Sequence, residues 1–187
     1  MKYCGECGSQ VELVIPKDDN RHRHVCLSCK TIHYYNPKIV AGCIPDLDGK
    51  ILLCKRAIEP QYGKWTLPAG FMENGESTTQ AAVRETLEEA NAMVEIQDLY
   101  TVINLPHVNQ VYLIYRAKLS DEGYSSGVES LEVDLYAEAD VPWEHLAFPV
   151  IRETLSLYFE DKRAGNFKIR TGEILKKEEG YEMRLHT

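Results

Sequence analysis

The sequence has no long hydrophobic run. None of its apolar stretches approaches the roughly 20 residues that a helix needs to span a bilayer. No apolar run follows a basic N-terminal start either, so we expect a cytoplasmic protein without a membrane segment. Basic residues are also scarce: 21 Lys and Arg stand against 29 Asp and Glu, which gives a net charge of −8. This balance argues against nucleic acid held on a general basic surface.

Cysteines are few, and their spacing excludes a simple disulfide framework. Four of the six cysteines form two C-x-x-C pairs separated by a short segment: Cys4, Cys7, Cys26 and Cys29. This spacing is typical of a four-thiolate zinc site, and a cytoplasmic chain would keep the thiols reduced. The other two, Cys43 and Cys54, lie in apolar strand-like runs and are expected to be small buried residues.

Residues 1–34 are therefore predicted to form a zinc ribbon. About thirty residues cannot bury enough surface to fold without a metal. Three histidines near the cysteines could be alternative ligands, but with four cysteines available we interpret them as surface residues: His22, His24 and His33. The segment has no dense basic cluster, so a structural or dimer-forming role is favoured over nucleic-acid binding.

The most informative stretch is residues 70–92. Ser77 and Gln80 have capping-box spacing, which predicts that a helix starts there. Four residues at i, i+3, i+4 and i+7 would form its buried face: Val83, Thr86, Leu87 and Ala90. Three glutamates share another face about one turn long: Glu85, Glu88 and Glu89.

Three like charges packed this closely should repel one another. A hard cation such as Mg²⁺ (or Mn²⁺), which prefers carboxylate oxygens and completes its shell with substrate phosphates, would remove the repulsion. The alternative is a solvated acidic face with Arg84 paired to Glu88. The preceding loop favours the cation, because Gly70 and Gly75 let the backbone approach a ligand or fold tightly over the helix start.

The pattern G-x5-E-x7-R-E-x-x-E-E resembles the Nudix box. It is carried here by Gly70, Glu76, Arg84, Glu85, Glu88 and Glu89. Two positions depart from the family: Asn91 replaces a glycine and Ala92 replaces a larger aliphatic residue. Asn tolerates the left-handed conformation at a helix C-terminus, so its substitution is conservative.

The resemblance implies an α/β fold, an α/β/α sandwich around a mixed sheet, for residues 35–160. It also implies metal-dependent hydrolysis of a nucleoside diphosphate derivative. The three box glutamates would be magnesium ligands, with one of them an alternative candidate for the base, and the Ala69 backbone carbonyl would join them. Arg84 and Glu76 would form an ion pair that orients the cluster.

Outside the box the candidates are fewer. A further glutamate often completes the metal site or acts as base in this family, and Glu132 is our first choice, with Glu129 as runner-up. Arg56 could bind phosphate, or be an ordinary surface arginine. Tyr112 could stack on a base, although a sheet-face tyrosine is favoured.

Residues 161–187 are expected to be a tail, with a strand near 167–170 and disorder in the last dozen residues. Segments 32–38, 56–60 and 65–73 resemble zinc-ribbon Nudix proteins that include FAD and ADP-ribose pyrophosphatases, so these substrates are favoured. An NADH pyrophosphatase and a non-catalytic nucleotide-sensing regulator remain alternatives. A homodimer is expected from the resemblance alone.

Overall fold

The computed structural model describes residues 1–186, and the chain divides into two compact units. The first unit is Met1–Pro37, and the second starts at Lys38. No helix within residues 1–186 combines the length and the apolar character that crossing a membrane requires.

The first unit is a three-stranded antiparallel sheet with almost no apolar core. Its strands are β1 (Val11–Val14), β2 (Arg23–Cys26) and β3 (Ile32–His33), in that order. Cys4 and Cys26 are its only buried residues. The cysteine cluster therefore occupies the place of a hydrophobic core, as expected for a unit of this size.

The second unit is built on a nine-stranded mixed sheet with order β10-β5-β4-β9-β8-β11-β12, to which β6 and β7 add at β5 and β4. The pairs β4–β9 and β8–β11 are parallel, and the other pairs are antiparallel. The strands are β4 (Lys38–Leu47), β5 (Lys50–Arg56), β6 (Trp65–Thr66), β7 (Ala69–Phe71), β8 (Val94–Leu105), β9 (Gln110–Leu119), β10 (Ser130–Tyr136), β11 (Arg170–Lys176) and β12 (Tyr181–His186). The α-helices are α1 (Thr78–Ala90) and α2 (Pro149–Ala164), and short 3₁₀ turns are η1 (Pro106–Val108), η2 (Glu138–Asp140) and η3 (Trp143–His145).

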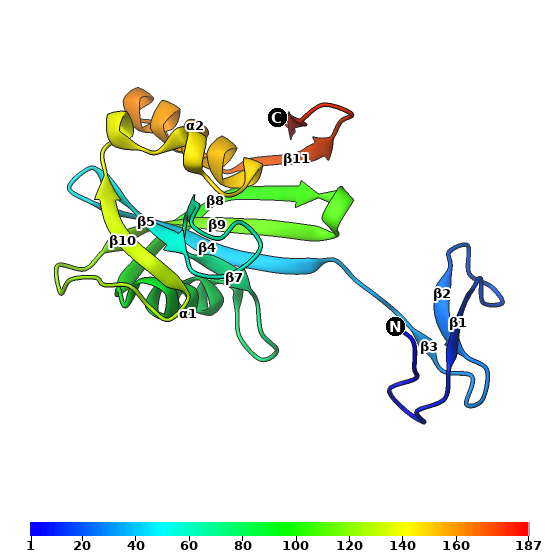
Figure 1. The fold of residues 1–187 in the computed structure, drawn as a ribbon. Helices are drawn as coiled ribbons and strands as arrows, with labels where there is room; N and C mark the ends of the chain where they lie inside the picture. The colour runs from blue at the N-terminus through cyan, green and yellow to red at the C-terminus, as the bar shows by residue number, and fades with distance from the viewer. Residues whose placement is uncertain (187) are drawn as a thin grey trace. The chain divides into compact units, whose positions relative to one another are not determined.

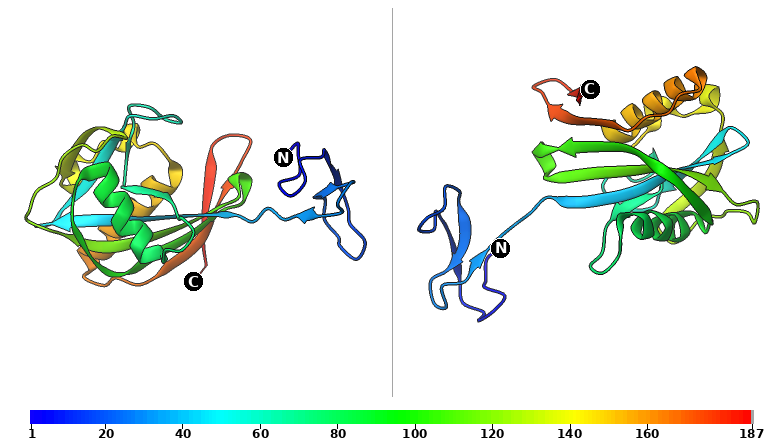
Figure 2. Two further views of the ribbon diagram at one scale, coloured as in Figure 1. Left: turned by 90° about the horizontal axis from the view of Figure 1, so that it is seen from below. Right: turned by 180° about the vertical axis from the view of Figure 1, so that it is seen from behind.

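The two α-helices lie on opposite faces of this sheet (Figures 1 and 2). Large residues fill the α2 side, with Ile44, Ile114 and Leu155 fully buried. Small residues fill the α1 side, where Ala81 and Ala82 belong to a separate cluster with strand residues. The predicted α/β/α sandwich is confirmed.

The C-terminal segment differs from the sequence prediction of a tail that ends in disorder. β11 joins the sheet parallel to β8, and β12 folds back on β11 as a hairpin. Ile174 is buried in the main core. The periodicity of the local sequence does not predict this pairing, because charged residues surround the turn at 177–180.

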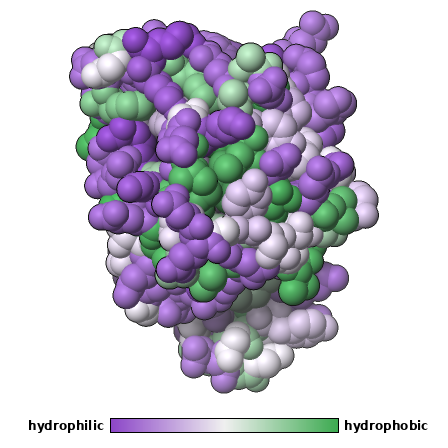
Figure 3. All heavy atoms as spheres, turned by 90° about the vertical axis from the view of Figure 1, so that its left-hand side faces the viewer, coloured by the Kyte–Doolittle hydropathy of each residue, from purple (hydrophilic) through white to green (hydrophobic). Residues whose placement is uncertain are grey.

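Hydrophilic side chains cover most of the side of the protein seen in Figure 3, and hydrophobic ones are visible between them near its centre. This mixture agrees with a chain in which 27% of residues are charged and 44% are hydrophobic.

Candidate metal and substrate site

Both ends of α1 are fixed by the local features that the sequence predicts. The Ser77 hydroxyl accepts from the Gln80 backbone N–H, and the Gln80 side chain accepts from the Ser77 N–H at 2.7 Å. At the other end Asn91 is left-handed, with φ 46°, and its backbone N–H donates to the Leu87 carbonyl. Asn91 thus provides the conformation for which the family uses glycine.

The three glutamates are not equivalent, contrary to the predicted helix face. Leu87 was expected to be buried and is 44% exposed, whereas Glu89 is only 6% exposed. The reason is that α1 packs its alanines against the small residues of the sheet, which turns Glu89 inward. Glu85 is half-buried and Glu88 is exposed.

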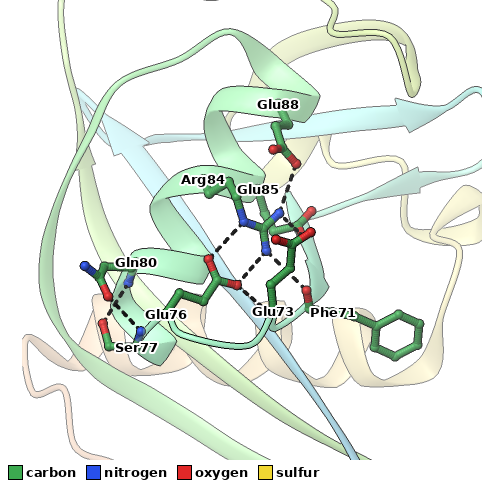
Figure 4. A network of polar contacts seen from close by, with 8 residues as sticks. All are labelled: Phe71, Glu73, Glu76, Ser77, Gln80, Arg84, Glu85 and Glu88. Atoms are coloured by element: carbon green, nitrogen blue, oxygen red, sulfur yellow. Dashed lines mark hydrogen bonds and ion pairs between the residues drawn. The ribbon is translucent and has the colours of Figure 1, made fainter.

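Arg84 lies at the centre of the carboxylates (Figure 4). It forms a bidentate ion pair with Glu76, in which Nη2 and Nε donate to the two carboxylate oxygens at 2.8 and 3.0 Å. Its Nη1 also donates to Glu85 at 2.7 Å and to Glu88 at 3.0 Å. Its Nη2 reaches the Phe71 carbonyl, so one guanidinium ties the loop before α1 to the helix. This guanidinium lowers the pKa of Glu76 to about 2.

Burial and mutual repulsion act on the inner carboxylates in the opposite direction. Desolvation, followed by the charge of Glu85, raises the pKa of Glu89 to about 8. Desolvation also raises the pKa of Glu85. The Ala69 N–H donates to Glu89 at 3.3 Å, but this one neutral donor does not offset the loss of water. Two neighbouring carboxyls whose ionisation is disfavoured in this way are suited to a cation, which would favour their ionised forms.

The carboxylates line a cavity of about 940 Å³ in the second unit. Arg56, Tyr112 and Ala69 line the same cavity, so the structure brings these predicted residues together. Apolar and aromatic walls that the sequence analysis did not single out come from distant segments: Ile58, Phe71, Leu105, Phe148, Ile174 and Tyr181. His107 also lines the cavity and packs against Tyr181 with the two rings tilted, at 5.5 Å between ring centroids.

Glu132 does not reach this cavity, which corrects our first choice of an outer glutamate. Its side chain is 54% exposed and pairs with Lys55 at 3.2 Å. The physical reason is an irregularity in β10, where the register with β5 shifts between Ser130 and Glu132. A shift of one residue changes the face on which a side chain lies.

Glu129, the runner-up, lines the cavity instead. Its backbone carbonyl accepts from the Ala57 N–H at 2.8 Å, next to Arg56. Its negative charge contributes to the raised pKa of both Glu85 and Glu89. The carboxylate on the loop, rather than the one on the strand, therefore faces the box glutamates.

Gly70 is required by the close approach of β7 to α1. A Cβ at this position would overlap the Glu85 carboxylate, which is the mobile end of a flexible side chain. We expect Gly70→Ala to displace that carboxylate at little cost in stability, and to lower turnover by about 100-fold. Steady-state kinetics and thermal melting check this, with Gly5→Ala as control because a Cβ there meets nothing within 4 Å. A variant that melts far below wild type would contradict it.

The donor sets of the two candidate metal sites differ in kind. The glutamates offer hard oxygen donors, which suit Mg²⁺ or Mn²⁺. In the described conformation Arg84 Nη1 donates to both Glu85 and Glu88. These two carboxylates must therefore release Arg84 before they can bind a cation. Among residues 1–186, the one group of three or more ligand atoms that lies within 4.8 Å is the four cysteines.

The cysteine geometry fits a tetrahedral zinc ion. The Sγ atoms of Cys4 and Cys29 are 3.6 Å apart, and those of Cys7 and Cys26 are 3.5 Å apart. Zn–S bonds of about 2.3 Å in a tetrahedron give sulfur separations near 3.8 Å. His33 Nε2 lies 3.3 Å from Cys4 Sγ, so this histidine contacts the cluster rather than being an ordinary surface residue.

Comparison with known proteins agrees with the division of the chain into two units. A family model described as Nudix N-terminal matches residues 2–35, and one described as NUDIX domain matches residues 36–147. The structure of a NUDIX hydrolase from Nitrosomonas europaea is 54% identical and has a TM-score of 0.91. It covers 94% of this chain and 100% of its own.

Curated relatives match over shorter regions. An ADP-ribose pyrophosphatase from Methanocaldococcus jannaschii is 38% identical over 39% of this chain and 43% of its own length. An NAD-capped RNA hydrolase NudC from Vibrio atlanticus is 35% identical over 48% of this chain and 31% of its own. The chain thus spans less than half the length of either relative. The NUDIX match covers more than half of the chain, which therefore belongs to the Nudix family and carries that family's N-terminal zinc-ribbon module.

Proposed function

We propose that this protein hydrolyses the pyrophosphate bond of a nucleoside diphosphate derivative with the help of Mg²⁺ or Mn²⁺. The observation that carries the proposal is the buried Glu89 beside Glu85 in a large cavity that also contains Arg56. A pyrophosphate is a polyanion, so glutamates can hold it only through cations. Nudix enzymes use divalent metals, and the donor set here suits them.

The proposal assigns the charged residues of the cavity to metal binding, proton transfer, phosphate binding or orientation of the helix. Glu85, Glu88 and Glu89, with the Ala69 carbonyl, would hold the cations, which neutralise phosphate charge and acidify a bound water. Glu129 takes the proton from the attacking water. Arg56 contacts phosphate oxygens, and its guanidinium is held by the Pro60 carbonyl at 2.9 Å and by the Phe148 ring. Arg84 holds Glu76 and orients the helix.

ADP-ribose is the substrate that we place first, followed by FAD and NADH. The apolar walls around Tyr112 and Tyr181 suit a base and its linked group better than a second polyanion. The name of the archaeal relative supports ADP-ribose, and the NudC relatives keep NAD-type substrates open. We retain a homodimer as part of the proposal. The edge strand β12, with exposed Tyr181 and Leu185, offers a surface for it.

A panel of ADP-ribose, FAD and NADH with added Mg²⁺ tests the proposal, with products separated by chromatography. Glu129→Gln should lower kcat by about 100-fold or more, as expected for loss of a general base. Glu132→Gln is the matched control, since this glutamate is exposed outside the cavity, and its kcat should equal that of wild type. If wild type cleaves none of the three, the chain is a nucleotide-binding regulator instead, and calorimetry with the same nucleotides would detect that binding.

A further inference from the structure

The loop that carries Glu129 is fastened to the C-terminal end of α1. The Ser125 N–H donates to the Ala90 carbonyl at 2.9 Å, and the Gly127 N–H donates to the Glu89 carbonyl at 3.0 Å. These are carbonyls that the end of a helix leaves without partners. A Cβ on Gly127 would overlap the Glu88 carbonyl oxygen, so the loop backbone lies directly against the helix.

The side chain of Asn91 adds a further attachment between the end of α1 and the loop. Its Nδ2 donates to the Ser126 carbonyl at 3.0 Å and to the Ser125 hydroxyl at 3.0 Å, and lies 3.5 Å from the Ser125 carbonyl. Between this attachment and Glu129 the loop is exposed, because Val128 is 97% exposed, and the Glu129 carbonyl then accepts from the Ala57 N–H at 2.8 Å. Asn91 therefore links the end of α1 to Ser125 and Ser126, which precede Glu129 by four and three residues.

Ending the helix does not require this amide. The left-handed conformation of Asn91, with φ 46°, and its backbone hydrogen bond to Leu87 are both available to glycine, at lower strain. The side chain thus does something besides capping, and its described partners all belong to the loop.

We propose that Asn91 is a positioning residue for Glu129, which holds the loop carboxylate over the box glutamates so that it can accept the proton from water. This inference rests on the proposed function, in which Glu129 is the base. It assigns a role to a residue at which the chain departs from the glycine of the family pattern.

Asn91→Gly tests the proposal because it keeps the helix end and removes only the amide. We expect kcat to fall about 10-fold, as for other losses of a supporting hydrogen bond, with KM within about twofold and an unchanged melting temperature. Hydrogen exchange at the Ser125 and Gly127 amides should become faster. The control is Asn109→Gly, because Asn109 is also left-handed, with φ 53°, and lies outside the cavity lining. It should behave as wild type.

The double variant Asn91→Gly with Glu129→Gln distinguishes the possible failures. If Asn91 acts through Glu129, the double variant should have the kcat of Glu129→Gln alone. Two independent, additive losses would overturn the proposal, and so would an Asn91→Gly enzyme with wild-type kcat beside an impaired Glu129→Gln enzyme. If Glu129→Gln itself keeps wild-type kcat, the assignment of the base is wrong, and the positioning role fails with it.

Discussion

Glu89→Gln is expected to lower kcat roughly 1,000-fold while leaving the fold intact. In the proposed function Glu89 holds a cation, and loss of such a ligand would remove several kcal/mol of transition-state stabilisation. The metal-free protein should become more stable at neutral pH, because the Glu89 carboxylate must take up a proton on folding at that pH, whereas glutamine occupies the same space and is neutral in both states.

The pH dependence of stability follows from the same shift. The pKa of Glu89 is raised from 4.5 to about 8 in the folded protein, so the folded state binds the extra proton. Stability of the metal-free protein should therefore fall as pH rises from about 4.5 through about 8, and be higher on the acid side. Added Mg²⁺ should offset the loss, since a bound cation favours the ionised carboxylate.

Urea unfolding between pH 5 and pH 8.5, with and without Mg²⁺, measures this behaviour. Glu89→Gln should flatten the metal-free profile. Glu95→Gln is the control, because Glu95 is exposed on β8 outside the cavity and its removal should leave the slope unchanged. A metal-free wild type that gains stability between pH 5 and pH 8 would refute the assignment of Glu89 as a buried, repelled carboxylate.

Cys26→Ser is expected to release the zinc and unfold the first unit. Cys26 is fully buried, and that unit has no other core than the cysteine cluster. Structural zinc contributes on the order of 10 kcal/mol or more to the folding of such modules. The second unit has its own cores and should keep its structure.

Elemental analysis should find one zinc per wild-type chain and none in the Cys26→Ser variant. Hydrogen exchange should lose protection in β1 and β2 but not in β4 or β9. Ser28→Ala, an exposed change between two ligands of the same knuckle, should retain the metal. Wild-type protein purified without chelator and found free of zinc would argue against the ribbon assignment.

Local spacing was enough to predict both candidate metal sites from the sequence. The two C-x-x-C pairs place their thiols in tight turns, and the capping box, the αL position of Asn91 and the i, i+3, i+4 glutamates all lie within one helix. Interactions between residues a few positions apart decide these features, so they can be predicted directly from the sequence.

What only the tertiary structure decided depends on contacts between distant segments. The pairing of β10 with β5, with its shift after Ser130, put Glu129 rather than Glu132 at the cavity. The pairing of β11 with β8, and of β12 with β11, brought Ile174 and Tyr181 to the cavity wall, although both lie far from the box glutamates in the sequence. Sheet packing also turned Glu89 inward while leaving Leu87 exposed. Strand register and helix rotation are set by the apolar area that remains exposed over the whole sheet. That total area depends on residues far apart in the sequence, so no short window of sequence predicts it.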